Sequence, residues 1–161
     1  MLLPHATVLT PNLREAEVLL DAPIGTLREQ HEAARALGAL GAATVVVKGG
    51  HAVTGIGSEA VDVVWDGRSV YELRGPRIDT ADNHGTGCTF ASATAAAPAC
   101  GSDVPDALAR AKSYVSRAIA GRAGWRLGRG HGPLDHFASP AGARAVGAAA
   151  ESGRSVDRKD G

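Results

Sequence analysis

The sequence is poor in aromatic residues and in cysteine, and it carries no excess of charge of either sign. Aromatic side chains make up 4% of the 161 residues against 44% that are hydrophobic, so a buried core must be built from alanine, valine and leucine. Two cysteines are too few for the disulfide framework of a small secreted domain. The 17 basic residues balance 17 acidic ones, which gives no reason to expect a nucleic acid or an acidic membrane surface as a partner.

Long apolar runs are also missing. No segment approaches the roughly 18–20 consecutive apolar residues of a membrane span. Residues 1–5 lack a basic segment followed by an apolar one, so we expect no signal peptide. Together these absences predict a soluble cytoplasmic protein. A chain of this length fits one domain, since domains cluster near roughly 100–150 residues.

The first 48 residues show signals in the order strand, helix, helix, strand. A short β-branched run at residues 6–10 predicts a strand. Helices are predicted at residues 12–20 and 26–40, the second opening on a capping-box pattern. The continuous β-branched run at residues 44–47 is typical of a strand buried on both faces. This order of elements predicts parallel pairing through a helical crossover.

The rest of the chain predicts a β-hairpin, two helices and a tail. Extended runs at residues 61–65 and 69–74 flank an Asp-Gly pair, and glycine accepts the positive φ of a tight hairpin turn. An alanine-rich helix should end at Pro98, and another helix should run over residues 103–121. Residues 139–161 hold hardly a bulky side chain, so we expect them to be disordered and residues 1–138 to form the domain.

One glycine-rich segment lies between a strand-like region and a predicted helix that begins at Cys88. It spans residues 84–89 and reads His-Gly-Thr-Gly-Cys-Thr. Its glycines let the backbone approach a ligand closely, and the unpaired N–H groups of a helix N-terminus form a ready site for phosphate. No Gly-Lys-Ser/Thr follows, so the segment is not a Walker loop. Taken alone, such a segment is more often a glycine turn and a helix cap.

Cys88 lies at the predicted N-terminus of that helix, whose positive end favours negative charge. A thiol there can serve as a base, a nucleophile or a ligand of an anion site. The alternative is a small buried hydrophobic residue, which is how most free cysteines behave, and we interpret Cys100 in that way. His84 and Cys88 are too few ligands to indicate zinc, and no spacing identifies the third residue of a cysteine hydrolase.

Two polar segments follow the predicted strands. Asn12 and Glu15 have the spacing of a capping box. They would also place an amide and a carboxylate at the carboxyl end of a strand, where such groups can orient the water shell of Mg²⁺. Lys48 ends the second strand beside Gly49 and Gly50. Its ammonium can reach a phosphate from there, or it can be a solvated lysine entering a turn.

Five segments in register resemble the hydroxymethylpyrimidine/phosphomethylpyrimidine kinases of thiamine biosynthesis, members of the ribokinase-like superfamily. They begin at Thr10, Val47, Pro76, His84 and Gly130, and read TPNLxEA, VKGGH, PRIDT, HGTGCT and GHGP. Each segment is weak evidence alone. Together they resemble the C-terminal half of the family's chain over residues 2–137.

The resemblance implies an α/β fold, a partial ribokinase-like three-layer αβα sandwich with a mostly parallel sheet and a β-hairpin. It implies ATP and Mg²⁺ as cofactors, and a small-molecule pyrimidine as substrate. Hydroxymethylpyrimidine would be phosphorylated first, and then its monophosphate. Pyridoxal kinases related to this family share the Gly-Thr-Gly-Cys segment, so a pyridoxal kinase-like activity is the alternative within the class.

By position, the resemblance also assigns residues to the site. Gly85, Thr86, Gly87 and Cys88 would form an anion hole around the transferring phosphoryl group. Cys88 would be the catalytic residue, because it stands where most of the superfamily has an aspartate base. Phosphoryl transfer depends mainly on positioning and charge stabilisation, which such donors supply.

Cation and metal contacts are assigned in the same way. Lys48 would contact the ATP phosphates, and Lys112 falls in the helix that flanks the nucleotide in this family. Asn12 and Glu15 would organise Mg²⁺, through water, and the phosphates. One departure lies nearby, since this chain has Asp82 where the family usually has asparagine, and an added carboxylate would repel phosphate.

The other departure is that the first half of the family's chain has no counterpart here. That half carries an early glycine-rich segment and most of the pyrimidine pocket. We therefore expect the 161-residue chain alone to have no pyrimidine kinase activity. We expect a separate N-terminal half or a second copy as its protein partner. A non-catalytic remnant that binds nucleotide and needs a partner chain is the alternative from another class.

Overall fold

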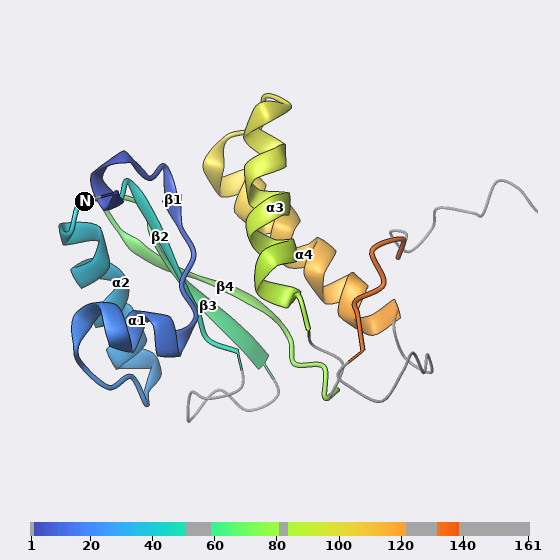
Figure 1. Ribbon diagram of the computed structural model, residues 1–161, viewed down its shortest axis with the longest axis horizontal. Coiled ribbons are helices and arrows are strands. Elements are labelled where there is room, and N and C mark those ends of the chain that lie inside the picture. Colours follow the sequence, from blue (N-terminus) through green and yellow to red (C-terminus); the bar gives the residue numbers. More distant parts are fainter. Residues whose placement is uncertain (1, 51–58, 81–83, 122–131, 139–161) are drawn as a thin grey trace, which may run out of the picture.

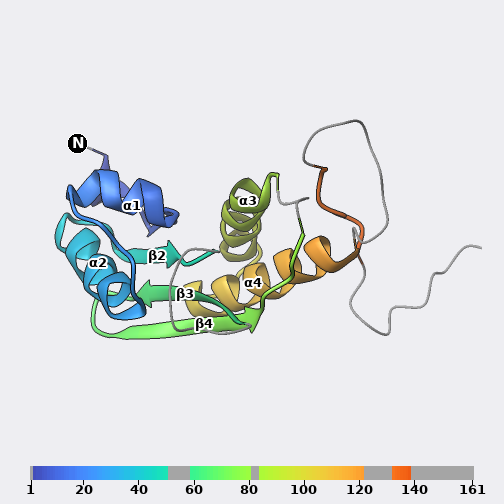
Figure 2. The same cartoon turned by 90° about the horizontal axis from the view of Figure 1, so that it is seen from below.

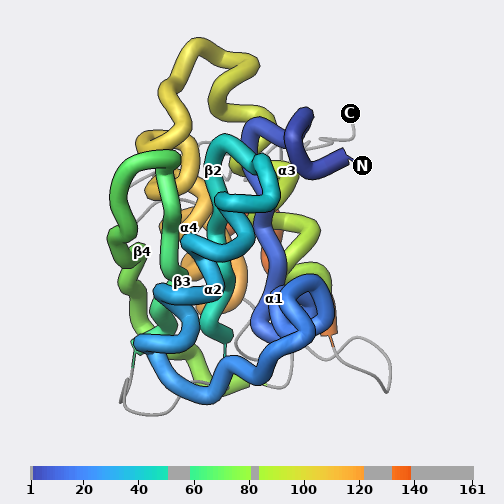
Figure 3. Tube along the Cα trace, turned by 90° about the vertical axis from the view of Figure 1, so that its left-hand side faces the viewer, coloured from blue at the N-terminus to red at the C-terminus, as the bar shows by residue number. Residues whose placement is uncertain are grey.

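The computed structural model describes residues 2–50, 59–80, 84–121 and 132–138. A four-stranded sheet separates two pairs of helices (Figure 1). Helices α1 (Leu13–Leu20) and α2 (Leu27–Ala39) cover one face, and α3 (Thr86–Ala99) and α4 (Val104–Gly121) lie on the other. Figure 3 looks onto the first pair, with the sheet behind it and α3 and α4 farther back. The three-layer αβα arrangement expected from the sequence is confirmed.

The strands follow one another across the sheet in chain order. They are β1 (Val8–Leu9), β2 (Thr44–Lys48), β3 (Glu59–Trp65) and β4 (Val70–Pro76). The predicted parallel crossover is confirmed between β1 and β2, with Val8 opposite Thr44. The pairs β2–β3 and β3–β4 are antiparallel. The described sheet is therefore mixed rather than mostly parallel, because the ten residues between β2 and β3 are fewer than the roughly dozen that a parallel crossover needs.

Helices α1 and α2 begin at the capping boxes that the sequence predicts. The Asn12 side chain accepts a hydrogen bond from the Glu15 N–H, and the Glu15 side chain accepts one from the Asn12 N–H. Thr26 and Glu29 form the same reciprocal pair at α2. These contacts satisfy N–H groups that have no partner within the helix.

Strand β2 is buried on both faces, as its sequence predicts. Val45 and Val47 pack against α1 and α2, while Val46 packs against the α3–α4 layer. All three side chains are fully buried. In the next strand Val63 and Val64 divide between the two faces in the same way. Valine suits these positions because it packs well on a pleated surface.

The boundaries of α3 differ from the predicted ones. The helix begins at Thr86, before Cys88, because Gly85 has φ +87° and turns the chain into the helix as its N-cap. Pro98 lies inside the last turn and does not end the helix, which stops at Ala99. Near the C-terminus, a proline removes one hydrogen bond without breaking the turns before it.

The predicted hairpin joins β3 to β4, which run side by side in Figure 2. Gly67 has φ +90°, and the Asp66 carboxylate accepts hydrogen bonds from the N–H groups of Arg68 and Ser69. Helix α4 begins at the predicted cap, where the Asp106 N–H donates to the Asp103 side chain over 2.8 Å. No helix in the described part of the chain is both long and apolar enough to cross a membrane.

Several predictions from the sequence fall outside the described residues. They are the disordered tail at residues 139–161, and the positions His51, Asp82, Asn83, Gly130 and His131. The domain boundary at residue 138 therefore stays a prediction.

Candidate active site

A pocket of about 410 Å³ lies between the sheet and the α3–α4 layer. Its charged and polar lining residues include Asn12, Lys48, Asp62, Arg77, Thr86 and Lys112. Its apolar walls include Ile78, Phe90, Val115 and Ile119. The pocket thus joins parts of four of the five segments that carry the resemblance, which lie before α1, at the end of β2, after β4 and at the start of α3.

The N-terminus of α3 opens onto this pocket through Thr86 and Gly87. The first hydrogen bond of the helix runs from the Thr89 N–H to the Gly85 carbonyl over 2.8 Å. No side chain caps this end, because the N-cap is glycine. Backbone N–H groups in a first turn lack helical partners and carry the positive end of the helix dipole. This end of α3 can therefore receive an anion.

Lys48 brings a positive charge to the same place. It is the last residue of β2, and its N–H donates to the Pro11 carbonyl over 2.9 Å, so it lies at the carboxyl end of both parallel strands. A Cβ atom at Gly87 would lie 3.0 Å from the Nζ atom of Lys48. Lys48 and Gly87, two candidate site residues far apart in the sequence, are thus in contact.

Asn12 and Glu15 differ in the surface hollows that they line. Asn12 lines both the pocket and a shallow groove of about 610 Å³ along α1 and β1, whereas Glu15 lines the groove and not the pocket. Their side chains form the capping box, with hydrogen bonds of 2.8 and 2.9 Å. Within the described residues no three acidic, histidine or cysteine side chains gather as metal ligands. A metal at this edge would keep most of its water shell, as Mg²⁺ commonly does.

Lys112 lies on α4 and points into the same pocket, but its charge already has a partner. Its Nζ atom lies 2.7 Å from Oδ2 of Asp62, a residue of β3 that is 6% exposed. The other carboxylate oxygen of Asp62 accepts the Gly49 N–H over 3.1 Å. Sequence reasoning missed Asp62. Its position between two valines in a predicted strand was the available signal, because a carboxylate buried there requires a partner.

Cys88 lies in the first turn of α3 and its side chain is exposed. His84, just before this helix, pairs in parallel with Pro133, so the segment after residue 131 reaches the same end of α3. That segment is held to α4 by two hydrogen bonds, from the Asp135 N–H to the Ala118 carbonyl and from the Tyr114 hydroxyl to the His136 carbonyl.

A glycine-capped helix N-terminus, a lysine at the carboxyl end of parallel strands and an αβα layering are features of the α/β proteins that bind phosphate groups. The chain matches the phosphomethylpyrimidine kinase family over residues 1–135. It belongs to that family, and the resemblance seen in its five segments is confirmed.

Relatives in sequence carry names from thiamine biosynthesis. The hydroxymethylpyrimidine/phosphomethylpyrimidine kinase of Mycobacterium tuberculosis is 47% identical over 133 residues, which is 83% of this chain and 47% of the relative. The thiamine biosynthesis bifunctional protein ThiED of Geobacter sulfurreducens is 46% identical over 136 residues, 84% of this chain and 27% of the relative. The chain thus spans about half the length of the single-function kinases it matches.

Among solved structures, the Bacillus subtilis pyridoxal kinase in complex with ADP superposes with a TM-score of 0.78 at 40% identity. The match covers 85% of this chain and 52% of that one. The Staphylococcus aureus pyridoxal kinase in complex with AMP-PCP and pyridoxal also has a TM-score of 0.78, at 38% identity, over 85% of this chain and 50% of that one.

Proposed function

We propose that this chain supplies the nucleotide-binding part of an ATP-dependent kinase that phosphorylates hydroxymethylpyrimidine and then its monophosphate. The observation that carries the proposal is the contact between Lys48 and Gly87, which joins an ammonium group to the positive end of α3 at the wall of a pocket. The family and the names of the sequence relatives support the acceptor. We place the protein in the cytoplasm, where its two free cysteines would stay reduced.

In this proposal the protein acts mainly by holding phosphate groups in place. The backbone N–H groups of residues 85–88 and the Lys48 ammonium bind the phosphate oxygens. Such donors stabilise the charge that develops on the transferring group, and they are already in place before the reaction. Cys88, exposed beside them, takes the proton of the attacking hydroxyl. The apolar walls at Val115 and Ile119 leave room for the rest of the nucleotide.

ATP would supply the phosphoryl group, and Mg²⁺ would neutralise charge on its phosphates. The residues present fit both. The α3 N-terminus and Lys48 suit an anion, and Asn12 lines the same pocket. Glu15 holds the Asn12 backbone with one carboxylate oxygen, Oε2. Its other oxygen can bind a metal-bound water, since a carboxylate accepts several hydrogen bonds.

A pyridoxal kinase-like activity is a second candidate. The observation that favours it is structural, because pyridoxal kinases from two species superpose on this chain with a TM-score of 0.78. The sequence relatives favour the pyrimidine, at 46–47% identity against 38–40% for these pyridoxal kinases. Offering both acceptors in one assay separates the two.

Nucleotide binding by the purified 161-residue chain is the first test. Titration with ADP in the presence of Mg²⁺ should give saturable binding, and Lys48→Met should weaken it by about tenfold or more, since a hydrogen bond to a charged group contributes about 1.5–3 kcal/mol. Arg28→Met is the matched control, because Arg28 is exposed on α2 and pairs with Glu32 away from the pocket. Absence of ADP binding by the wild-type chain would contradict the proposal.

Phosphoryl transfer is the second test. Because the chain spans about half of its relatives, we expect no turnover of either acceptor by the chain alone. Turnover should appear when the part of the Mycobacterium tuberculosis kinase that this chain does not span is added. Cys88→Ala should abolish that turnover and keep the ADP affinity. Turnover that survives Cys88→Ala would remove the proton-accepting role, and full activity of the chain alone would refute the need for a partner.

A further inference from the structure

Asp62 makes two contacts that link three elements of the fold beneath the pocket. Its Oδ2 atom pairs with Nζ of Lys112 on α4 over 2.7 Å, and its Oδ1 atom accepts the N–H of Gly49, just after β2, over 3.1 Å. Both charged side chains are largely buried, with 8% of Asp62 and 14% of Lys112 exposed. A buried carboxylate with an ammonium and an amide on its two oxygens is held in one orientation.

Lys112 reaches Asp62 by crossing β4 at a glycine. A Cβ atom at Gly75 would lie 3.3 Å from Cε of Lys112, so a larger residue there would press on the lysine stem. In the sheet, Gly75 lies opposite Ala60 and Leu73 lies opposite Asp62. The stem thus passes over the edge strand β4 to a carboxylate on the inner strand β3. Among the ion pairs of the described residues, this is the one that joins α4 to the sheet.

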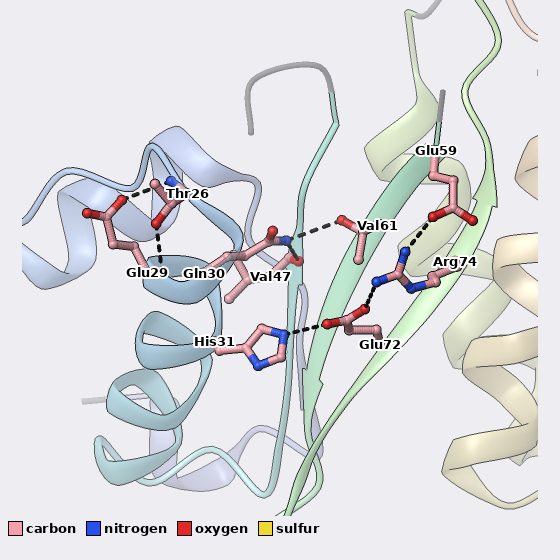
Figure 4. Close-up of polar contacts among 9 residues, drawn as sticks. All are labelled: Thr26, Glu29, Gln30, His31, Val47, Glu59, Val61, Glu72 and Arg74. Carbon is pink, nitrogen blue, oxygen red and sulfur yellow. Dashed lines mark hydrogen bonds and ion pairs between the residues drawn. The ribbon is translucent and has the colours of Figure 1, made fainter. Parts of the chain in front are cut away.

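The backbone just after Lys48 is also held in place by close contacts, as Lys112 is. A Cβ atom at Gly49 would lie 2.0 Å from the Val61 carbonyl oxygen, so the turn packs directly on β3. Gln30 of α2 supports the same point from the other face, and its amide donates to the carbonyls of Val47 and Val61 (Figure 4). The position of the Lys48 stem therefore depends on contacts made by its neighbours.

The phosphate site is divided between the two parts that Asp62 connects. Lys48 belongs to the sheet, whereas Gly87 belongs to α3, which packs on α4 through Phe90 and Leu108. Figure 2 shows α3 and α4 lying together on the side of the sheet away from α2. A shift of this layer against β2 would part the Lys48 ammonium from the α3 N-terminus.

We propose that Asp62 is the positioning residue of the phosphate site. One of its oxygens fixes the turn after Lys48, and the other holds Lys112 and with it the α3–α4 layer. Lys112 then acts through Asp62 and not as a direct ligand of phosphate. The inference rests on the proposed nucleotide function and adds to it a residue that no resemblance assigned.

The test compares ADP and adenosine binding to the full chain and to three variants, Asp62→Asn, Lys112→Met and the double variant. Asparagine keeps an acceptor for the Gly49 N–H but turns an N–H donor toward the lysine. We expect each single variant to weaken ADP binding by about tenfold, within the usual range of coupling between neighbouring sites. We expect the double variant to bind ADP about as weakly as each single variant, without adding their two losses, and adenosine binding to stay unchanged. Glu72→Gln, on the same hairpin but outside the pocket lining, should keep wild-type ADP affinity.

Thermal unfolding of the same variants separates positioning from a purely structural role. The double variant removes both charges and should recover most of the stability that a single buried charge costs. If ADP affinity recovers with stability, or if Asp62→Asn binds ADP as the wild type does, the inference is wrong. If Lys112→Met weakens ADP binding and Asp62→Asn does not, Lys112 is a direct ligand of phosphate and the inference is also wrong. Failure of the wild-type chain to bind ADP would instead refute the proposed function, and this inference with it.

Discussion

The ammonium nitrogen of Lys48 lies 3.0 Å from the place that a Cβ atom would take at Gly87. One residue ends a strand of the sheet, and the other lies in the first turn of α3. A glycine at position 87 therefore lets a side chain from one layer reach the helix end of another. The phosphate site therefore requires a residue without a Cβ atom at position 87.

Gly87→Ala should separate binding from stability. Gly87 does not have a positive φ, and alanine in a helix is favoured over glycine by up to about 1 kcal/mol, so the thermal midpoint should stay constant or rise. The added methyl group would displace Lys48 and weaken ADP binding by about tenfold. Calorimetric titration with ADP and a thermal melt of the same sample measure the two effects.

Gly101→Ala is the matched control for that variant. Gly101 follows the other end of α3 and has φ +87°, and a Cβ atom added there would meet nothing within 4 Å. Alanine at this position therefore strains the backbone without touching the site. It should lower stability and keep ADP affinity. Equal ADP affinity of Gly87→Ala and the wild type would show that the Lys48 contact does not matter for binding.

Glu15→Gln tests whether Glu15 serves Mg²⁺ or only the capping box. Glutamine also completes a capping box, so the stability of α1 should change little. The loss of charge should weaken ADP binding in the presence of Mg²⁺ and leave it unchanged in EDTA. Glu29→Gln alters the equivalent residue of the α2 capping box, away from the pocket, and should affect neither condition. A Mg²⁺ effect of equal size in both variants would exclude a metal role for Glu15.

The elements that the sequence predicted correctly are those specified by neighbouring residues. The capping boxes at Asn12 and Thr26, the valines of β2 and the Asp-Gly turn at Asp66 each need only a few adjacent positions. Such local rules state where a helix begins or a strand turns. They also placed Lys48 at the end of a strand, which is where the structure has it.

The features that escaped prediction depend on partners distant in the sequence. Asp62 is explained only by Lys112 and Gly49, and nothing near it in the chain indicates either contact. Helix α3 starts at Thr86 because Gly85 adopts a positive φ. The segment also contains Gly87, and the sequence alone does not indicate which of the two glycines takes that conformation. Whether Cys88 is buried or exposed also depends on residues distant in the sequence, and in the structure its side chain is exposed.

The hairpin turn should respond to acid through Asp66. Hydrogen bonds from the Ser69 and Arg68 N–H groups lower the pKa of Asp66 below its usual value of 3.8. A carboxylate whose pKa is lower in the folded state stabilises the fold above its usual pKa, and this contribution is lost as the pH falls through the folded pKa. Asp66→Asn keeps an acceptor oxygen but does not titrate.

Urea unfolding at several pH values measures this contribution. At neutral pH, Asp66→Asn should be slightly less stable than the wild type, because the charged acceptor makes stronger hydrogen bonds. The difference should shrink between about pH 5 and about pH 2, where the wild-type carboxylate becomes protonated. A difference that stays constant across this range would mean that Asp66 does not contribute through its charge.

Gln30 should be the most sensitive polar residue of α2. Its side chain is fully buried, and its Nε2 atom donates to the carbonyls of Val47 and Val61 over 2.8 and 3.3 Å (Figure 4). Gln30→Met keeps the volume but removes the buried donor that the two carbonyls share, which should lower the free energy of unfolding by about 1–3 kcal/mol. Gln30→Glu should cost more at neutral pH, because a carboxylate has no hydrogen to donate and would be buried beside two acceptors.

Acid distinguishes these two variants. Protonated glutamic acid can donate one hydrogen bond, so Gln30→Glu should regain part of its stability relative to Gln30→Met as the pH falls below neutrality. Arg35→Met, on the exposed side of the same helix, should change stability by no more than about 0.5 kcal/mol. Urea midpoints at two pH values measure all of these differences. Wild-type stability of Gln30→Met would mean that the two carbonyls find other donors, and the support that Gln30 gives to the turn after Lys48 would then be unnecessary.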